Sequence, residues 1–418
     1  MSRSTARKCL APGTTVAPRE VLVPTEIGDP IRGMLPCPAA PLVGGMLEGR
    51  GLEVRYGPVP RCADASQADE GAVLFVTSAL HSDGGGTALG AAASAVDSRA
   101  LAAASAVVEE WSAVVATRRL VTGVSPWCDG ARHALERAQK AVATSASRIY
   151  ILGCLAGTRQ ARDELAEAGA IVAASLAEIP DGATVFIPAH GVAPAVLAEA
   201  AERNLEVIDA TCPLVAGAHQ EARRFAERGD QVVLIGHRSH PVVPGIAGHA
   251  GDRLTLAESS AGAANAVADP RRISYLLQPG IPVEDAAPVM AALRSRFPGL
   301  HSPDPDRFCY AASDRAETVR AVASTCDVVL VLGDDGDPDT RQVTAFARDG
   351  RAKVHVISAA GQIVPSWLAG TAAIGVAETT SAAPGLAGEV TTALSGLGQL
   401  SVTQRLVSTQ LTTPGQVS

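Results

Sequence analysis

The stretch EVIDATCPLVAGAHQEARRFAE, residues 206–227, places a short apolar segment, a cysteine and an amphipathic segment in immediate succession. The β-branched and aliphatic residues at 206–209 are typical of a strand, and Ala216–Glu227 has the apolar spacing of a helix. In α/β folds, chemically active residues lie in the loops that follow the carboxyl ends of parallel strands. The stretch therefore predicts an α/β unit that carries Cys212 at its functional edge.

The same alternation of strands and helices continues along most of the chain. Further strands are expected at Arg148–Leu152, Thr184–Pro188, Gln231–Ile235 and Asp327–Leu332, and further helices at Arg132–Ala143, Gln160–Ala168, Ala286–Arg296 and Ala316–Ser324. Nearly continuous apolar strands separated by helices indicate parallel sheets that are covered on both faces. The fold class is therefore α/β, built from several small units.

A domain boundary is expected near residue 115, where a helix at 101–119 gives way to a new strand. A chain of 418 residues is long enough for two to four domains. We expect residues 1–115 to form an N-terminal α/β domain of unknown role, residues 116–400 to form the main region, and the polar residues 401–418 to form a C-terminal tail.

The composition excludes some classes of function. A net charge of −8 argues against a nucleic-acid binder, which needs a basic face to displace counterions. No apolar run approaches the roughly 18 residues that would span a bilayer, and no export signal is visible. We therefore expect a cytoplasmic protein that binds neither nucleic acid nor membranes.

The chain contains eight cysteines, none of them in a C-x-x-C pair, which excludes zinc-ribbon and thioredoxin-like sites. Cys128, Cys212 and Cys309 each lie next to the expected start of a helix, where the helix dipole lowers the pKa of a thiol. Three thiolates can ligate three irons of a [4Fe–4S] cluster and leave the fourth iron open. The alternative is that they are ordinary buried cysteines. In a reducing compartment we expect the others, Cys9, Cys37, Cys62, Cys154 and Cys326, to be structural thiols rather than disulfides.

The strings around these cysteines closely resemble the 4-hydroxy-3-methylbut-2-enyl diphosphate reductase family. They are Cys128-Asp129-Gly130-Ala131-Arg132, Ala189-His190-Gly191-Val192, Asp209-Ala210-Thr211-Cys212-Pro213-Leu214-Val215, Ile235-Gly236-His237-Arg238-Ser239-His240-Pro241 and Phe308-Cys309-Tyr310-Ala311. The resemblance runs from about Arg119 to about Leu397. It implies three pseudo-threefold-related α/β units around a central [4Fe–4S] cluster on Cys128, Cys212 and Cys309. It also implies single electrons supplied by ferredoxin or flavodoxin.

The resemblance further implies several residues that contact the substrate. His190 and His240 match histidines of the family that contact the diphosphate, and we assign them catalytic roles in orienting or protonating the substrate. Gln278 and Ser381 lie in matching stretches, and Thr158 and Thr340 are candidates for the pocket wall.

Other positions depart from the family pattern. Gly157 replaces a histidine, Val242 replaces the glutamate of the proton relay, and Pro279 and Gly280 replace paired threonines. Without a carboxylic acid at position 242, the family's relay has no proton donor there.

The largest departure is the segment Gly333–Thr340, where the family has serine and asparagine and this chain has four aspartates. Ionised aspartate only accepts hydrogen bonds, and each like-charge contact with a diphosphate at ~5 Å costs about 3 kcal/mol. Asp335, Asp337 and Asp339 would instead grip a cationic group. The alternative is a solvated surface turn, since Asp and Gly favour turns.

These departures lead to one main hypothesis and two alternatives. The main hypothesis is a [4Fe–4S] reductase, in specialised metabolism, that removes a hydroxyl or amine leaving group from a small molecule lacking a diphosphate. The first alternative is the authentic diphosphate reductase, which makes isopentenyl and dimethylallyl diphosphate. The second is a non-catalytic iron–sulfur sensor or scaffold, suggested by the extra N-terminal residues. A quinolinate-synthase type of fold also draws three cysteines from three domains, but its motifs do not match these strings.

Overall fold

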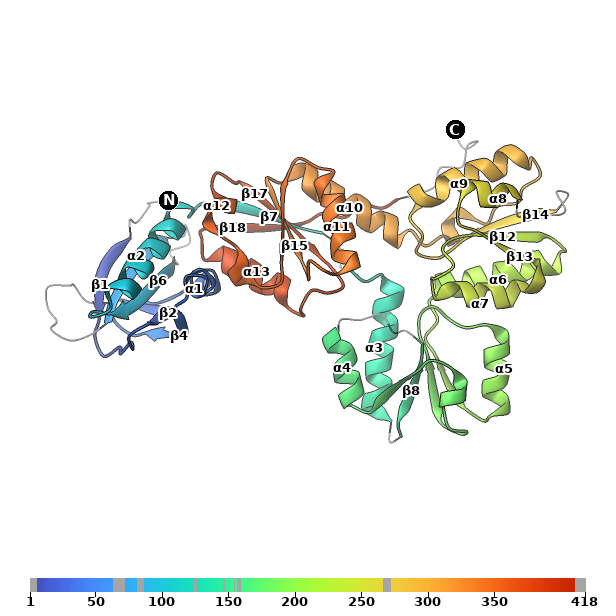
Figure 1. Cartoon of the computed structure of the whole chain (residues 1–418), viewed down its shortest axis with the longest axis horizontal. Coiled ribbons are helices and arrows are strands. Elements are labelled where there is room, and N and C mark those ends of the chain that lie inside the picture. Colours follow the sequence, from blue (N-terminus) through green and yellow to red (C-terminus); the bar gives the residue numbers. More distant parts are fainter. Residues whose placement is uncertain are drawn as a thin grey trace. The chain divides into compact units, whose positions relative to one another are not determined.

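The structure, a computed structural model, describes residues 6–62, 72–80, 86–123, 126–145, 147–153, 155, 159–265 and 272–409. The chain divides into two compact units, which are coloured along the sequence in Figure 1. Unit 1 comprises residues 1–124 and 318–405, and unit 2 comprises residues 125–317 and 406–418. Unit 1 is thus built from two stretches that lie far apart in the sequence.

The N-terminal part of unit 1 is a six-stranded sheet with two helices, α1 (Ala40–Glu48) and α2 (Ser98–Ala113). The sheet has the order β1-β5-β6-β2-β3, with β4 beside β2, and only the β2–β4 pair is parallel. Its strands are β1 (Arg7–Ala11), β2 (Glu20–Asp29), β3 (Gly33–Pro36), β4 (Glu53–Val59), β5 (Ala72–Leu80) and β6 (Gly86–Ser94). The expectation of parallel pairing is therefore wrong for this part of the chain, because short apolar strands do not reveal their direction.

The second sheet of unit 1 is parallel throughout, in the order β16-β15-β17-β7-β18. Its strands are β7 (Arg118–Thr122), β15 (Val328–Leu332), β16 (Lys353–Ile357), β17 (Ala373–Glu378) and β18 (Leu400–Gln404), and the last includes the first residues of the expected tail. The connecting elements are α11 (Pro338–Arg348), η4 (Ala360–Gln362), α12 (Pro365–Leu368) and α13 (Leu386–Ser395), and α10 (Ala311–Thr325) leads into β15. The apolar runs thus formed buried parallel strands, as the sequence indicated.

The two sheets of unit 1 share one hydrophobic core. Leu42 and Trp111 from the N-terminal part are buried in the same cluster as Leu330 and Leu394. The backbones of α1 and η4 approach closely, since a Cβ on Gly45 would lie 2.2 Å from the carbonyl oxygen of Gly361. Residues 1–115 are therefore packed against the last α/β unit, and the boundary near residue 115 stays a prediction.

Unit 2 contains two parallel sheets. The first has the order β11-β10-β8-β9, and the second has the order β13-β12-β14. Their strands are β8 (Ile149–Leu152), β9 (Ala170–Ala173), β10 (Thr184–Ile187), β11 (Glu206–Asp209), β12 (Gln231–Ile235), β13 (Leu254–Ala257) and β14 (Ile273–Leu277). The helices are α3 (Asp129–Thr144), α4 (Arg159–Glu167), η1 (Leu176–Glu178), α5 (Pro194–Glu202), α6 (Pro213–Glu227), α7 (Val242–Ala250), η2 (Gly251–Arg253), α8 (Ser260–Asn265), α9 (Val283–Arg296) and η3 (Pro305–Arg307).

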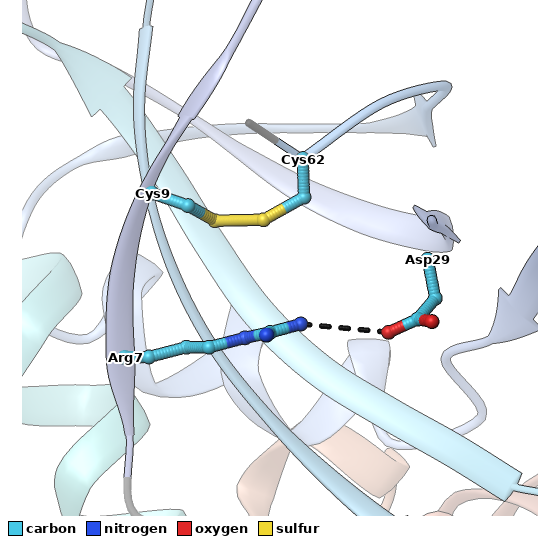
Figure 2. Close-up of a disulfide and its surroundings, with 4 residues drawn as sticks. All are labelled: Arg7, Cys9, Asp29 and Cys62. Atoms are coloured by element: carbon cyan, nitrogen blue, oxygen red, sulfur yellow. Dashed lines mark hydrogen bonds and ion pairs between the residues drawn. A yellow bond between two sulfur atoms is a disulfide. The ribbon is translucent and has the colours of Figure 1, made fainter. Parts of the chain in front are cut away.

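A disulfide joins Cys9 of β1 to Cys62, which follows β4, and Figure 2 shows it close to the ion pair between Arg7 and Asp29. The expectation that these two cysteines are unpaired structural thiols is wrong. The two residues are 53 positions apart in sequence and both are buried. Their pairing depends on the register of the N-terminal sheet, which the sequence pattern did not reveal. Cys37 and Cys326 are free and buried, as expected.

No helix in the described residues is long and apolar enough to cross a membrane.

Candidate functional site

Each of the three predicted cluster cysteines lies at or near the start of a helix. Cys128 is the N-cap of α3, and its Sγ accepts a hydrogen bond from the backbone N–H of Ala131 at 3.4 Å. Cys212 is the N-cap of α6, and Cys309 lies between η3 and the start of α10. The N-terminal end of a helix favours negative charge, so these positions suit thiolates.

The three thiols converge within unit 2. Burial raises the pKa of Cys309, and the charges of Cys128 and Cys212 raise it further. Backbone hydrogen bonds from Ala311 and Gly280 act in the opposite direction and lower it. The side chain of Cys212 also points at α3, because a Cβ on Gly130 would lie only 2.5 Å from its Sγ.

The donor set suits a polynuclear iron–sulfur cluster. Three mutually repelling thiolates need a cationic partner, and backbone N–H groups directed at thiolate sulfurs are a common way to stabilise such clusters. Within the described ranges, no three His, Cys, Asp or Glu side chains form the ligand set of a single metal ion.

His190 and His240 lie close together, with their ring centroids 5.4 Å apart in an edge-on arrangement. His190 follows β10, and His240 precedes α7. Burial lowers the pKa of His190, and burial followed by the charges of His190 and His237 lowers the pKa of His240 to about 4. The backbone N–H of Val242 donates to Nδ1 of His240 at 3.3 Å, so the neutral ring carries its proton on Nε2. Both rings are therefore neutral near pH 7.

Gln278 is buried just after the end of β14, and its Oε1 accepts a hydrogen bond from the backbone N–H of His237 at 2.7 Å. A Cβ on Gly236 would lie 2.5 Å from the same oxygen. The amide of Gln278 therefore holds the loop that leads to His240, and its role in binding substrate stays a prediction.

The aspartate segment of unit 1 has two kinds of carboxylate. Asp337 caps α11 by accepting from the backbone N–H of Thr340 at 3.0 Å, and Asp339 accepts from the backbone N–H of Thr380 at 2.8 Å. Asp334 and Asp335 are exposed. Two of the four carboxylates thus stabilise local backbone, as in the surface-turn alternative.

Beside this segment lies a cluster of three hydroxyl groups around Gly333. Oγ1 of Thr340 lies 2.9 Å from Oγ1 of Thr379 and 3.0 Å from Oγ of Ser381. A Cβ on Gly333, whose φ is +156°, would lie within 2.7 Å of all three oxygens. The backbone N–H of Asp334 donates to Ser381 Oγ at 2.9 Å. Hydroxyl groups can donate hydrogen bonds to phosphate oxygens, which carboxylates cannot.

The structure therefore brings some of the predicted site residues together within one unit. Unit 2 holds Cys128, Cys212, Cys309, His190, His240 and Gln278, and unit 1 holds Asp335, Asp337, Asp339, Thr340 and Ser381. Thr158, Gly157 and Cys154 lie outside the described residues. Val242 is completely buried in an apolar cluster, so position 242 supplies no acid.

One residue of unit 1 was missed from the sequence. Thr379 belongs to the hydroxyl cluster, and its position at the end of the apolar strand β17 was the signal available. In unit 2, His219 lies in a stretch that matches the family, but no role could be derived for it from the sequence; it is buried in α6, about two turns after Cys212.

Known proteins resemble this chain over most of the region after β7. The profile of the family described as LytB protein matches residues 120–395. A Mycobacterium bovis protein named 4-hydroxy-3-methylbut-2-enyl diphosphate reductase 2 is 36% identical over 296 residues, which cover 70% of this chain and 90% of that protein. A relative from Mycolicibacterium paratuberculosis, named 4-hydroxy-3-methylbut-2-enyl diphosphate reductase, is 38% identical over 273 residues, covering 64% of this chain and 82% of the relative.

Two solved structures share the fold. The structure of the E-1-hydroxy-2-methyl-but-2-enyl-4-diphosphate reductase from Plasmodium falciparum has a TM-score of 0.59 at 20% identity and covers 69% of this chain and 92% of its own. The structure of an (E)-4-hydroxy-3-methyl-but-2-enyl diphosphate reductase has a TM-score of 0.56 at 23% identity and covers 66% and 99%. They confirm the α/β fold with several short parallel sheets. From its matched residues and its close relatives, the chain belongs to the LytB family.

Proposed function

We propose that this oxidoreductase is a 4-hydroxy-3-methylbut-2-enyl diphosphate reductase that makes isopentenyl and dimethylallyl diphosphate. The observation that carries the proposal is the convergence of Cys128, Cys212 and Cys309 in unit 2 of a LytB chain. Its support is the shared name of relatives that are 36–38% identical over most of their length. The expectation of a substrate without a diphosphate, in specialised metabolism, finds no support among these relatives.

The three cysteines would hold a [4Fe–4S] cluster. When bound, such a cluster would supply single electrons and one iron without a protein ligand. The chain's own contribution is a set of backbone donors beside the thiols. N–H groups of Ala131, Gly280 and Ala311 point at Cys128 and Cys309, and at Cys309 they oppose the effect of burial, which still leaves the pKa of that thiol raised.

The diphosphate would be bound by neutral donors rather than by fixed positive charge. His190 and His240 are neutral rings, and each carries one N–H that can donate to a phosphate oxygen. In unit 1, Asp337 and Asp339 already accept hydrogen bonds from backbone N–H groups, although both keep their charge.

A small one-electron carrier such as ferredoxin or flavodoxin would supply the electrons. The proposal also places the protein in the cytoplasm. The test uses anaerobically purified, cluster-loaded protein, reduced chemically and given the hydroxylated diphosphate. Release of isopentenyl and dimethylallyl diphosphate is expected. A protein with a normal cluster signal and no such products would contradict the proposal and favour a different substrate.

The cluster ligands can be tested separately by electron paramagnetic resonance of the reduced protein. Cys212→Ala is expected to lose the signal. Cys326→Ala is the matched control, because Cys326 is also a free cysteine but is buried in an apolar cluster of unit 1. An unchanged signal in Cys212→Ala would exclude Cys212 as a ligand.

A further inference from the structure

His219 is wedged between two glycines that belong to different segments of unit 2. A Cβ on Gly191 would lie 2.7 Å from Cε1 of His219, and a Cβ on Gly245 would lie 2.8 Å from its Nε2. The side chain is 7% exposed. Glycine at both positions therefore makes room for one imidazole ring.

The ring is held by packing rather than by hydrogen bonds. It stacks on His249 of α7, with centroids 4.5 Å apart and planes 25° apart. Its Nε2 is buried and has no hydrogen-bond partner in the described part of the chain. Burial, together with the charge of His249, lowers the pKa of His219 to about 4 despite the opposing effect of Asp209. The imidazole ring of His219 is thus neutral and tightly packed.

The segments in contact with this imidazole ring carry the candidate site residues. Gly191 directly follows His190, and Gly245 lies in α7, which begins just after His240. His219 itself is on α6, the helix that Cys212 caps. The side chain of Thr211, the residue before Cys212, would lie 2.9 Å from the same Cβ on Gly191. One ring therefore sets the spacing of three separate segments.

A cavity of about 230 Å³ lies on the open side of this packing and is lined by Asp209, Thr211, His219 and His249 among others. Loss of the ring would therefore enlarge a space that is already empty. The loop of His190 and α7 would lose the contact that keeps them apart and would relax in part towards that space.

We infer that His219 is a positioning residue, which fixes the loop of His190 and the helix after His240 relative to the Cys212-bearing helix. The inference rests on the proposed function, since that function gives His190 and His240 their roles. It adds a residue that acts through the segments it separates.

The test compares three variants in the full-length, cluster-free protein. His219→Ala removes the imidazole ring. Gly245→Ala keeps the ring and adds a methyl group against its Nε2. In the variant that carries both substitutions, the added methyl group can occupy the space that the ring has left. His355→Ala is the matched control, because His355 of unit 1 also stacks on a ring, that of Trp367, and also has a buried Nε2 without a partner in the described residues.

The readouts are the imidazole NMR signals of His190 and His240 and the alkylation rate of Cys212. In His219→Ala and in Gly245→Ala, both histidine signals should move and the alkylation rate should change at least about threefold. The methyl group should add no further change in the His219→Ala background. His355→Ala should match the wild type. Unchanged signals and alkylation in Gly245→Ala, or equal changes in His355→Ala, would overturn the inference.

Turnover of the cluster-loaded protein then separates positioning from binding. A displacement near 1 Å can reduce a rate about 100-fold, so kcat of His219→Ala should fall by about 10- to 100-fold, with a smaller change in KM. A wild-type enzyme that makes no isopentenyl diphosphate would refute the proposed function. The NMR and alkylation results do not depend on the substrate, so they would still decide whether His219 fixes these segments.

Discussion

Gly130→Ala tests the convergence of the cluster cysteines with a single methyl group. The new Cβ would lie 2.5 Å from Sγ of Cys212 and 2.9 Å from its Cβ. Non-bonded carbon contacts are optimal at about 3.5–4.0 Å, so the thiol must move by about 1 Å. Overpacking of this kind costs about 1–3 kcal/mol, and alanine in place of a helical glycine recovers about 1 kcal/mol. The net loss of stability is therefore at most about 2 kcal/mol, while the thiol itself is displaced.

The displacement of the thiol should reduce the iron content of the protein more than it reduces the stability of the fold. After anaerobic reconstitution, we expect Gly130→Ala to bind less iron and sulfide per chain than the wild type and to show an altered electron paramagnetic resonance spectrum. Gly388→Ala is the matched control, since Gly388 is also helical and a Cβ there would meet nothing within 4 Å. It should unfold at a slightly higher temperature and keep its full iron content. Wild-type iron content and spectrum in Gly130→Ala would refute the placement of Cys212 against α3.

Three further predictions concern stability. Reduction of the Cys9–Cys62 disulfide, which closes a span of 53 residues, should lower the free energy of unfolding by about 4 kcal/mol in chemical denaturation; a Cys9→Ala variant that still responds to the reductant would contradict this. Arg118→Met should cost about 1–3 kcal/mol because it removes the side-chain donor of the carbonyl of Val114, whereas the exposed Arg119→Met should be nearly neutral in the same assay; equal effects would argue against this role of Arg118. The pKa of His240 is about 4 in the fold, below the ordinary value of 6.5, so its contribution to stability is present above pH 6.5 and is lost as the pH falls towards 4. Melting temperatures measured across this range should decline less in His240→Gln, and a parallel decline would contradict the assignment.

The parallel sheets and the cysteine positions could be predicted because both follow from local patterns. Apolar runs such as Val328–Leu332 are buried on both faces only in a covered parallel sheet, and Cys212-Pro213 marks the start of a helix by its residue types. The direction of the N-terminal strands and the Cys9–Cys62 pair depend on register between distant segments. No local pattern encodes that register.

The site could be predicted only in part for a similar reason. A cysteine can be recognised as a possible metal ligand from its residue type alone. His219, in contrast, gains its proposed role only because two glycines allow its ring to pack closely against their backbones. Asp337 and Asp339 illustrate the opposite case, and their contact with a ligand stays a prediction. Their charge suggested a cationic ligand, whereas their carboxylates accept backbone N–H groups of Thr340 and Thr380. Whether a polar side chain serves a ligand or the backbone depends on neighbours that the sequence does not place.

The buried Val242 decides where protons for the proposed reaction can come from within unit 2. Its side chain is packed in an apolar cluster with Val243 and Ile246, so a carboxylate at this position would lose its hydration without gaining a partner. The backbone N–H of the same residue donates to Nδ1 of His240 and leaves the proton of that ring on Nε2. Position 242 therefore acts through its backbone, by fixing the tautomer of a neutral imidazole beside His190. With a pKa of about 4 this ring is neutral near pH 7, so its Nε2–H can donate a hydrogen bond but is a poor source of a proton, and the acid of the proposed reaction has to come from a group other than Val242 and His240.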